Sequence, residues 1–139
     1  MRLWHIDLIP YLPNGQLLAQ WRELNSIFKK QDNHILINYV YKYDKSYLLN
    51  YTKHVMQEFK NRGYYINAML NYTVYFGDTT CDGTERFDEH DFDYLTICYY
   101  NLKEKFLRGQ GDFTQEVWNE LVAFYHNEER LQNTTFETY

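Results

Sequence analysis

Several histidines and a run of acidic residues carry side chains that could bind a metal ion. The histidines are spread along the chain as His5, His34, His54 and His90, and the acidic run is Asp88-Glu-His-Asp-Phe-Asp93. Zinc sites commonly place paired ligands a few residues apart, as in His-x₃-His or Cys-x₂-Cys. Neither spacing occurs in this sequence. We therefore expect no metal site and no other cofactor.

A tyrosine-rich segment could bind nucleic acid or a protein by stacking, because aromatic rings next to cations hold bases without any chemistry. Aromatic residues make up 19% of the chain. A helical binding module is therefore one hypothesis, and the alternative is a small domain whose tyrosines reach from core to solvent. The residues of this segment are Tyr39, Tyr41, Tyr43, Tyr47 and Tyr51, with Lys42, Lys45 and Lys53 between and after them.

The net charge of −5 argues at first against a nucleic-acid partner, but the charge is unevenly distributed. Residues 1–63 contain nine bases and five acids, a charge of +4, whereas residues 64–139 contain five bases and 14 acids, a charge of −9. Nucleic-acid binding depends on the local basic surface more than on the net charge. The uneven charge thus permits a DNA-facing first half, and a solvated face with an acidic loop is the alternative.

The chain is long enough for one domain with one core. No run of about 18 apolar residues is present, so no membrane partner is expected. The start lacks the apolar stretch of a signal peptide. The two cysteines, Cys81 and Cys98, form no disulfide framework, so we expect a reduced, cytoplasmic protein.

Apolar residues recur at helical spacing in four segments, which we expect to be α-helices. Capping residues mark their ends, because Asp44 can cap a helix that Gly63 ends, and Asp112 with Gln115 forms a capping-box pattern. The pattern predicts an all-α fold, a compact single-domain bundle of about four helices. The expected helices run from about Asn14 to Lys30, from Asp44 to Arg62, from Asp91 to Arg108, and onward from Asp112.

The segments between these helices are less regular. His34–Tyr41 has strand propensity but no partner strand, so a short helix or an extended connection fits equally well. We expect Asn71–His90 to be a long irregular acidic loop, with an extended piece at Tyr72–Phe76. A single domain is expected over residues 1–131, followed by a frayed tail over residues 132–139.

The first expected helix carries most of a family resemblance. Gly15–Phe28, with its Leu, Ala, Arg-Glu-Leu and Phe at matching spacing, resembles the first helix of the pyrimidine-dimer DNA glycosylases, the phage T4 endonuclease V family. The stretch from Asp44 to Gly63 is similar to a later helix of that family, and Met1-Arg-Leu-Trp-His5 is similar to its short bacterial members. Together these segments cover about the first half of the chain.

The resemblance implies a largely helical single domain and a DNA-repair chemistry. In the family, the α-amino group of the chain attacks C1′ of the deoxyribose and displaces the base. A Schiff base forms, and β-elimination then cuts the strand. The resemblance therefore implies a glycosylase and AP lyase that acts on damaged double-stranded DNA, at pyrimidine dimers or other damaged or abasic sites.

The resemblance also assigns roles to residues of this sequence. Met1 would supply the nucleophilic amine, and we expect Met1 to be retained because Arg2 is too large for the usual removal of the initiator. An α-amine is partly neutral at cellular pH, and a neighbouring cation favours the neutral form. Glu23 would be the catalytic acid or base. The expected DNA contacts are Arg2, Arg22, Lys29, Lys30 and His34.

Three departures from the family pattern concern DNA binding. Ser26 stands where the family has a further arginine, the basic loop after the first helix is reduced to Lys29–Asn33, and Thr134–Tyr139 lacks the aromatic, lysine-bearing end. We therefore expect weaker DNA binding and altered lesion specificity. A module that keeps the fold but not the chemistry is the alternative.

Overall fold

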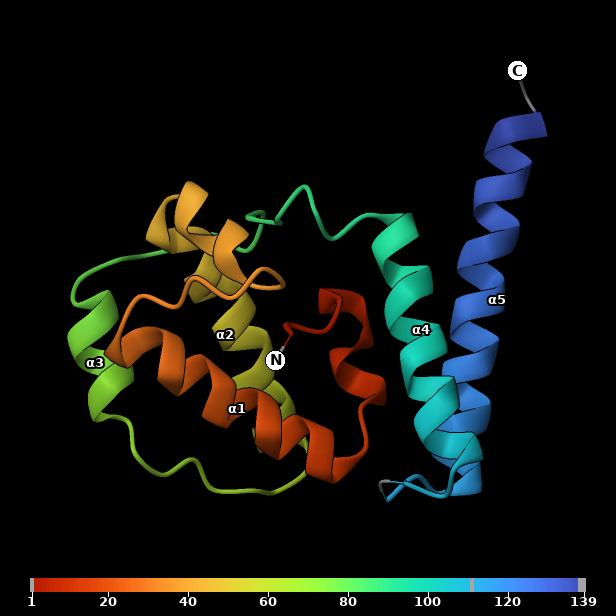
Figure 1. Cartoon of the computed structure of the whole chain (residues 1–139), viewed down its shortest axis with the longest axis horizontal. Helices are drawn as coiled ribbons and strands as arrows, with labels where there is room; N and C mark the ends of the chain where they lie inside the picture. The colour runs from red at the N-terminus through yellow and green to blue at the C-terminus, as the bar shows by residue number, and fades with distance from the viewer. Residues whose placement is uncertain (1, 111, 138–139) are drawn as a thin grey trace.

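Helices make up all of the regular structure in the described part of the chain. The computed structural model describes residues 2–110 and 112–137, and over these residues it contains five α-helices, two 3-10 helices and no strand (Figure 1). The all-α prediction is confirmed, but the prediction of about four helices is too low. In chain order the elements are η1 (Ile6–Tyr11), α1 (Asn14–Lys29), η2 (Asn38–Lys42), α2 (Lys45–Asn61), α3 (Leu70–Phe76), α4 (Phe92–Leu107) and α5 (Gln115–Glu137).

The start of α2 follows the capping chemistry expected from the sequence, and the start of α4 is capped in the same way. Asp44 Oδ1 accepts a hydrogen bond of 3.0 Å from the Ser46 backbone N–H at the start of α2. Asp91 Oδ1 accepts one of 2.9 Å from the Tyr94 N–H at the start of α4. These side chains satisfy amides that have no partner inside the helix.

The last helix begins later than expected, at Gln115 instead of Asp112. Thr114 Oγ1 accepts a hydrogen bond of 3.1 Å from the Val117 N–H, while Asp112 Oδ1 accepts one of 3.2 Å from the N–H of Gly15. The expected capping box is therefore wrong, because Asp112 binds the start of α1 instead. Helix α5 continues over residues 132–137, where a tail was expected, and residues 138–139 lie outside the described residues.

Helix α3 occupies the beginning of the segment expected to be a loop, so the expected extended piece at Tyr72–Phe76 is wrong. The physical reason is an aromatic cluster against the end of α1. The ring of Phe28 lies 5.1 Å from that of Phe76 and 5.3 Å from that of Tyr75, measured between centroids. Burying one face of a two-turn helix overrides strand propensity. The rest of the loop, from Gly77 to Asp91, is irregular as expected.

The segment with strand propensity forms a turn at His34–Ile37 followed by η2, so the short-helix alternative is confirmed. Tyr39 and Val40 of η2 are buried, whereas Ile35 and Leu36 are exposed. Burial therefore does not alternate along this segment as it would in a half-buried strand. The described residues contain no strand with which it could pair.

The N-terminal segment and η1 lie between two groups of helices. Figure 1 shows α1, α2 and α3 on one side and the antiparallel pair of α4 and α5 on the other. Leu3, Leu8 and Leu102 are fully buried in one hydrophobic cluster that draws on both groups. In the described part of the chain, no helix is both long enough and apolar enough to span a membrane.

Aromatic stacking joins α4 to α5 and accounts for part of the aromatic excess. The rings of Tyr99 and Tyr125 are nearly parallel, with centroids 4.0 Å apart. Phe106 stacks on Trp118 at 4.4 Å. Offset-stacked rings add to the stability gained by burial alone. This helix pair thus owes its packing to the aromatic residues.

Candidate active site

The backbone of the N-terminal segment is held by hydrogen bonds from three different helices. The Trp4 N–H donates to Gln20 Oε1 of α1 at 2.9 Å, and the Tyr51 hydroxyl of α2 donates to the Trp4 carbonyl at 2.7 Å. The Tyr94 hydroxyl of α4 donates to the carbonyl of Leu3. The chain end therefore enters the molecule along a fixed path.

Gln20 connects this segment to Glu23. Its Nε2 atom donates to the Arg2 carbonyl at 3.2 Å and to Glu23 Oε2 at 2.9 Å. Gln20 is fully buried, and its Oε1 also lies 2.9 Å from the Tyr51 hydroxyl. One side chain therefore contacts both the first described residue and the carboxylate of Glu23.

Glu23 is half-buried on the face of α1 that points to the N-terminal segment. Burial raises the pKa of its carboxyl above the usual value, while the hydrogen bond from Gln20 and the charge of Arg22 act in the opposite direction. A carboxyl whose pKa is moved toward neutrality can both accept and return a proton at cellular pH. The position suits general acid–base chemistry.

A hollow of about 240 Å³ lies in front of Glu23. Sequence reasoning expected Arg2 and Glu23 at a common site, and both line this hollow. It did not expect Asn101 and Lys105, which α4 contributes from the other side. No motif marks these two residues, because only the packing of α4 against the N-terminal segment brings them there. The full lining is Arg2, Trp4, Gln16, Glu23, Leu36, Asn101 and Lys105.

The cation of Arg2 is placed by α4 as well. Its guanidinium carbon lies 5.8 Å from the centroid of the Tyr94 ring, within the range of a cation–π contact. The expected nucleophile, Met1, lies outside the described residues. The site therefore combines a half-buried carboxylate with two cations, Arg2 and Lys105.

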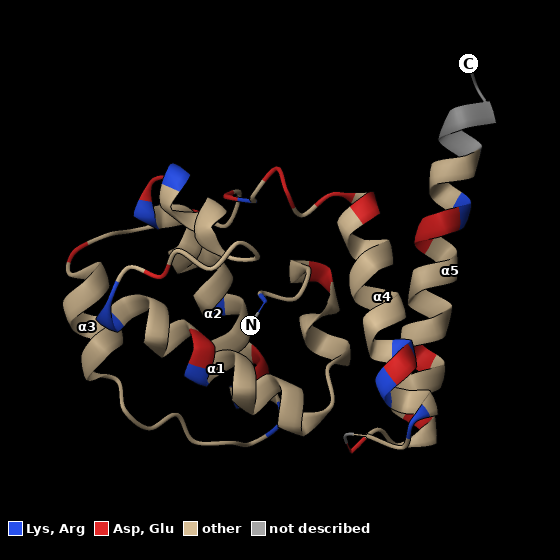
Figure 2. Cartoon of the chain, in the orientation of Figure 1, with Lys and Arg blue, Asp and Glu red and all other residues tan. Residues whose placement is uncertain are grey.

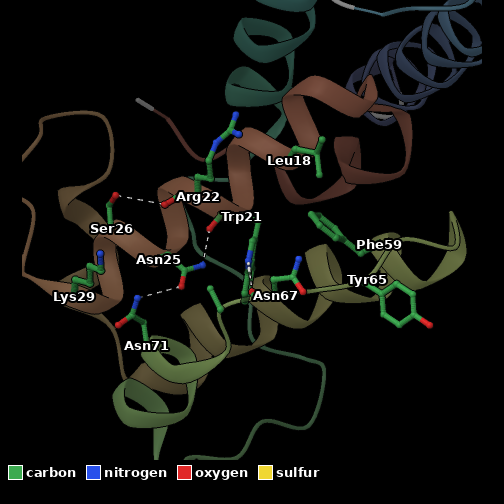
Figure 3. A pocket seen from close by; sticks show the side chains of 11 residues that line it. Leu18, Trp21, Arg22, Asn25, Ser26, Lys29, Phe59, Tyr65, Asn67 and Asn71 are labelled. Atoms are coloured by element: carbon green, nitrogen blue, oxygen red, sulfur yellow. Dashed lines mark hydrogen bonds between the residues drawn. The ribbon is translucent and has the colours of Figure 1, made fainter.

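Arg22 and Lys29 line a different hollow, of about 430 Å³, on the opposite face of α1 (Figure 3). Helical geometry requires this, because residues 18, 22, 25 and 29 share one face while 16, 20 and 23 share the other. Figure 3 shows the amides of Asn25 and Asn67 beside the indole of Trp21, whose Nε1 donates to the Asn67 carbonyl at 3.3 Å. Arg22 and Lys29, two of the expected DNA contacts, therefore do not line the hollow in front of Glu23.

The last two expected DNA contacts also lie apart from Glu23. Lys30 lines a third hollow together with Lys45 and Tyr75. His34 is exposed in the turn before η2, where its Nδ1 accepts a hydrogen bond of 3.1 Å from the Leu36 N–H. In the view of Figure 2, basic residues are scattered over several elements, and acidic residues gather on the loop before α4 and on α5.

Of the four histidines considered as metal ligands, His5 and His90 serve packing, whereas His34 and His54 are exposed. His5 and His90 are both buried and stack with centroids 5.5 Å apart. The Ile6 N–H donates to His90 Nδ1 at 3.3 Å, and His90 Nε2 lies 2.6 Å from the Tyr39 hydroxyl. Burial lowers the pKa of His90 to about 3, so the ring is neutral. Across residues 2–110 and 112–137, no three histidine, cysteine or acidic side chains meet as metal ligands would.

The tyrosine-rich segment does not form a stacking surface. Tyr39 and Tyr51 are buried, and Tyr51 is among the largest fully buried side chains. Tyr41, Tyr43 and Tyr47 are half-buried and pack against the core. The alternative that the tyrosines reach from core to solvent describes these residues better.

Comparison with known proteins gives a match to a protein family. A family model described as pyrimidine dimer DNA glycosylase matches residues 1–72. No curated protein and no solved structure matches the chain. The matched residues include the N-terminal segment, Gln20 and Glu23 and end inside α3, so Asn101 and Lys105 lie outside them.

Proposed function

The chain belongs to the pyrimidine dimer DNA glycosylase family, and on that basis we propose that it is a DNA-repair glycosylase and AP lyase. Its substrates are double-stranded DNA with pyrimidine dimers or other damaged or abasic sites. The α-amine of Met1 is the nucleophile, and Glu23 is the acid–base residue. The reaction needs no cofactor, because the chain itself supplies the amine.

The chemistry proceeds in two stages. The neutral amine bonds to C1′ of the deoxyribose, the base leaves with the electrons of the glycosidic bond, and the proton that the new C–N bond releases from the amine goes to the departing base. Glu23 then protonates the ring oxygen, which opens the sugar and leaves an iminium at C1′. In the second stage the Glu23 carboxylate removes a 2′ proton, and the 3′ phosphate leaves as the strand is cut.

The hydrogen bonds of Gln20 are the observation that carries this proposal. The Arg2 carbonyl and Glu23 Oε2 lie 3.2 and 2.9 Å from the same amide nitrogen. Met1 is one peptide unit from Arg2, and adjacent Cα atoms lie about 3.8 Å apart. This supports an α-amine within reach of a sugar that Glu23 also contacts.

The DNA contacts are proposed on both sides of α1. Arg2 faces the hollow at Glu23, and Arg22, Lys29, Lys30 and His34 lie toward the end of α1 and beyond it. Cations at these positions contact phosphates and set the register of the duplex. The acidic second half weakens the overall attraction. Because the proposed contacts are made to phosphates, binding falls as the salt concentration rises.

Reductive trapping tests the proposal. The purified protein is mixed with duplexes that carry an abasic site or a pyrimidine dimer and is then treated with borohydride, which converts a Schiff base into a stable adduct. We expect an adduct with the wild type, loss of the adduct when the N-terminus is blocked, and loss of strand cleavage in Glu23→Gln. Glu116→Gln, an exposed glutamate of α5, is the matched control and should behave as the wild type.

The outcomes separate the proposal from its rival. No adduct and no cleavage on either duplex would contradict the enzyme, and salt-dependent binding alone would then indicate a module that retains the fold without the chemistry. The intact mass of the protein establishes whether Met1 is the first residue. An adduct that survives a blocked N-terminus would assign the nucleophile to a lysine.

A further inference from the structure

We propose that Gln20 is a positioning residue that joins the N-terminal segment and the Glu23 carboxylate into one rigid unit. The reaction that this unit serves is the one proposed above, so the inference rests on that function. Gln20 contacts neither the hollow nor solvent, because its side chain is fully buried. It therefore acts on the reaction only through the groups that it holds.

The hydrogen-bonding capacity of Gln20 is completely used. A primary amide has two N–H donors and an oxygen with two acceptor sites. The donors are directed to the Arg2 carbonyl and to Glu23, and the oxygen accepts from the Trp4 N–H. The Tyr51 hydroxyl, which has a single proton, lies 2.9 Å from the Gln20 oxygen and 2.7 Å from the Trp4 carbonyl and shares that proton between them. A buried amide with four partners has one orientation, so its neighbours are fixed relative to each other.

The chemistry of these partners also decides which end of the amide faces which group. A rotated amide would place its NH₂ against the Trp4 N–H and its oxygen against the Arg2 carbonyl and the Glu23 carboxylate. Both arrangements are repulsive, so the network itself sets the orientation. Glutamate at this position would bring a second negative charge to Glu23, and methionine would leave the Trp4 amide without its acceptor.

Helical spacing explains why this residue can hold Glu23. Residues 20 and 23 are neighbours on one face of α1, as side chains three positions apart are. The N-terminal segment crosses that face, since the Trp4 N–H and the Arg2 carbonyl both bond to Gln20. Tyr51, from α2, holds the segment a second time through the Trp4 carbonyl.

Gln20 also affects the proton affinity of Glu23. The N–H of Gln20 stabilises the charged carboxylate, so it lowers the pKa of a group that burial raises. Removal of that donor raises the pKa further. When the carboxylate acts as the base of the elimination, cleavage slows as the pH falls through the pKa of Glu23. This acid limb of the pH–rate profile therefore moves to higher pH.

The test uses two substitutions, Gln20→Met and Gln20→Glu, with Gln57→Met as the matched control. Gln57 is an exposed glutamine of α2 whose amide donates to Asn61 Oδ1 at 2.8 Å. Single-turnover trapping and strand cleavage on an abasic-site duplex are both measured against pH, and DNA affinity is measured separately. We expect trapping at neutral pH to fall by about tenfold or more while DNA affinity changes by less than about twofold, because misplacing a reacting group slows the chemistry alone.

A second readout needs no DNA. The Glu23 carboxyl is titrated by ¹³C NMR in protein with labelled glutamate, and its pKa should rise in both Gln20 variants and stay unchanged in Gln57→Met. In Gln20→Glu the two carboxyls titrate as a pair, and the apparent pKa is the quantity compared. Gln20→Glu keeps an acceptor oxygen for Trp4 and Tyr51 but places a carboxyl oxygen against Glu23, whereas Gln20→Met removes the acceptor and adds no charge. Circular dichroism identifies which variant is folded, and the titration is compared in that variant.

Tyr51→Phe separates the two parts of the inference. It removes the hydroxyl that contacts the Trp4 carbonyl and Gln20 Oε1 but leaves the donor to Glu23 intact. The rate of Schiff-base trapping should fall, while the acid limb of the pH–rate profile for cleavage should stay at the same pH. The inference would be overturned if the Gln20 variants lost DNA affinity and reaction rate to the same extent. It would also be overturned if the pKa of Glu23 were unchanged in folded Gln20 variants. A wild type that forms no adduct would overturn the proposed function alone, since the NMR titration still decides what Gln20 does.

Discussion

The guanidinium of Arg86 donates two hydrogen bonds to the carboxylate of Asp7, at 2.9 and 3.1 Å. The pair joins the start of η1 to the irregular loop before α4. It lies immediately after the buried N-terminal segment and thus helps to fix the direction from which that segment enters the site. A two-point contact between planar groups has a defined geometry that a single contact lacks.

Arg86→Met should lower stability at neutral pH, and the difference should disappear in acid. Burial raises the pKa of Asp7, but the hydrogen bonds and charge of Arg86 outweigh it and leave the pKa below its usual value. The stability from this pair is therefore complete above the unfolded-state pKa of about 3.9 and is lost as the pH falls through the lower folded-state value. Urea unfolding at several pH values measures the effect. Arg108→Met, which breaks an exposed pair with Glu104, should have a smaller effect.

His90→Gln should flatten the dependence of stability on pH below neutrality. The wild-type folded state keeps His90 neutral down to a pKa of about 3, whereas the unfolded state takes up a proton near pH 6.5. Stability is therefore full above pH 6.5 and falls between these two values, with a slope of about 1.4 kcal/mol per pH unit for one proton. Equal slopes in the His90 variant and the wild type would contradict the buried neutral ring.

Leu102→Ala should destabilise the whole domain by about 2–5 kcal/mol, because it opens a cavity at a fully buried position. Leu107→Ala, on the same helix but 70% exposed, is the control and should cost far less. Urea unfolding followed by tryptophan fluorescence and by circular dichroism gives the two values. A single transition by both probes would show that α4 unfolds with the family-matched half. Separate transitions would mean that the two groups of helices are independent.

Lys105→Met should weaken binding of an abasic-site duplex by about three- to tenfold and reduce the slope of log affinity against log salt by about one, as loss of one phosphate contact does. Lys105 lines the hollow at Glu23 from α4. Lys53→Met, at an exposed position of α2, is the matched control. Binding is measured by fluorescence anisotropy across a salt series. An unchanged slope would remove Lys105 from the DNA-binding surface.

The sequence predicted the parts of this protein whose causes are local. The stripes of α1, α2 and α4, with the cap at Asp44, depend on neighbours within one or two turns, and these predictions are confirmed. The family is confirmed for the same reason, since its residues lie in register along the first half. The positions of Arg22 and Glu23 on α1 also follow from helical spacing.

Tertiary structure alone decided the rest. Helix α3 exists because Phe76 is buried against Phe28, and Asp112 bonds to Gly15 instead of capping α5. Asn101 and Lys105 join the site because α4 packs beside the N-terminal segment. No sequence pattern indicates a role for Gln20. A glutamine on an apolar stripe gains its role only when folding brings its four partners, from the N-terminal segment, α1 and α2, within hydrogen-bond distance. Spacing along the chain thus determined which residues each helix presents, and contacts between distant segments determined which of them can act together.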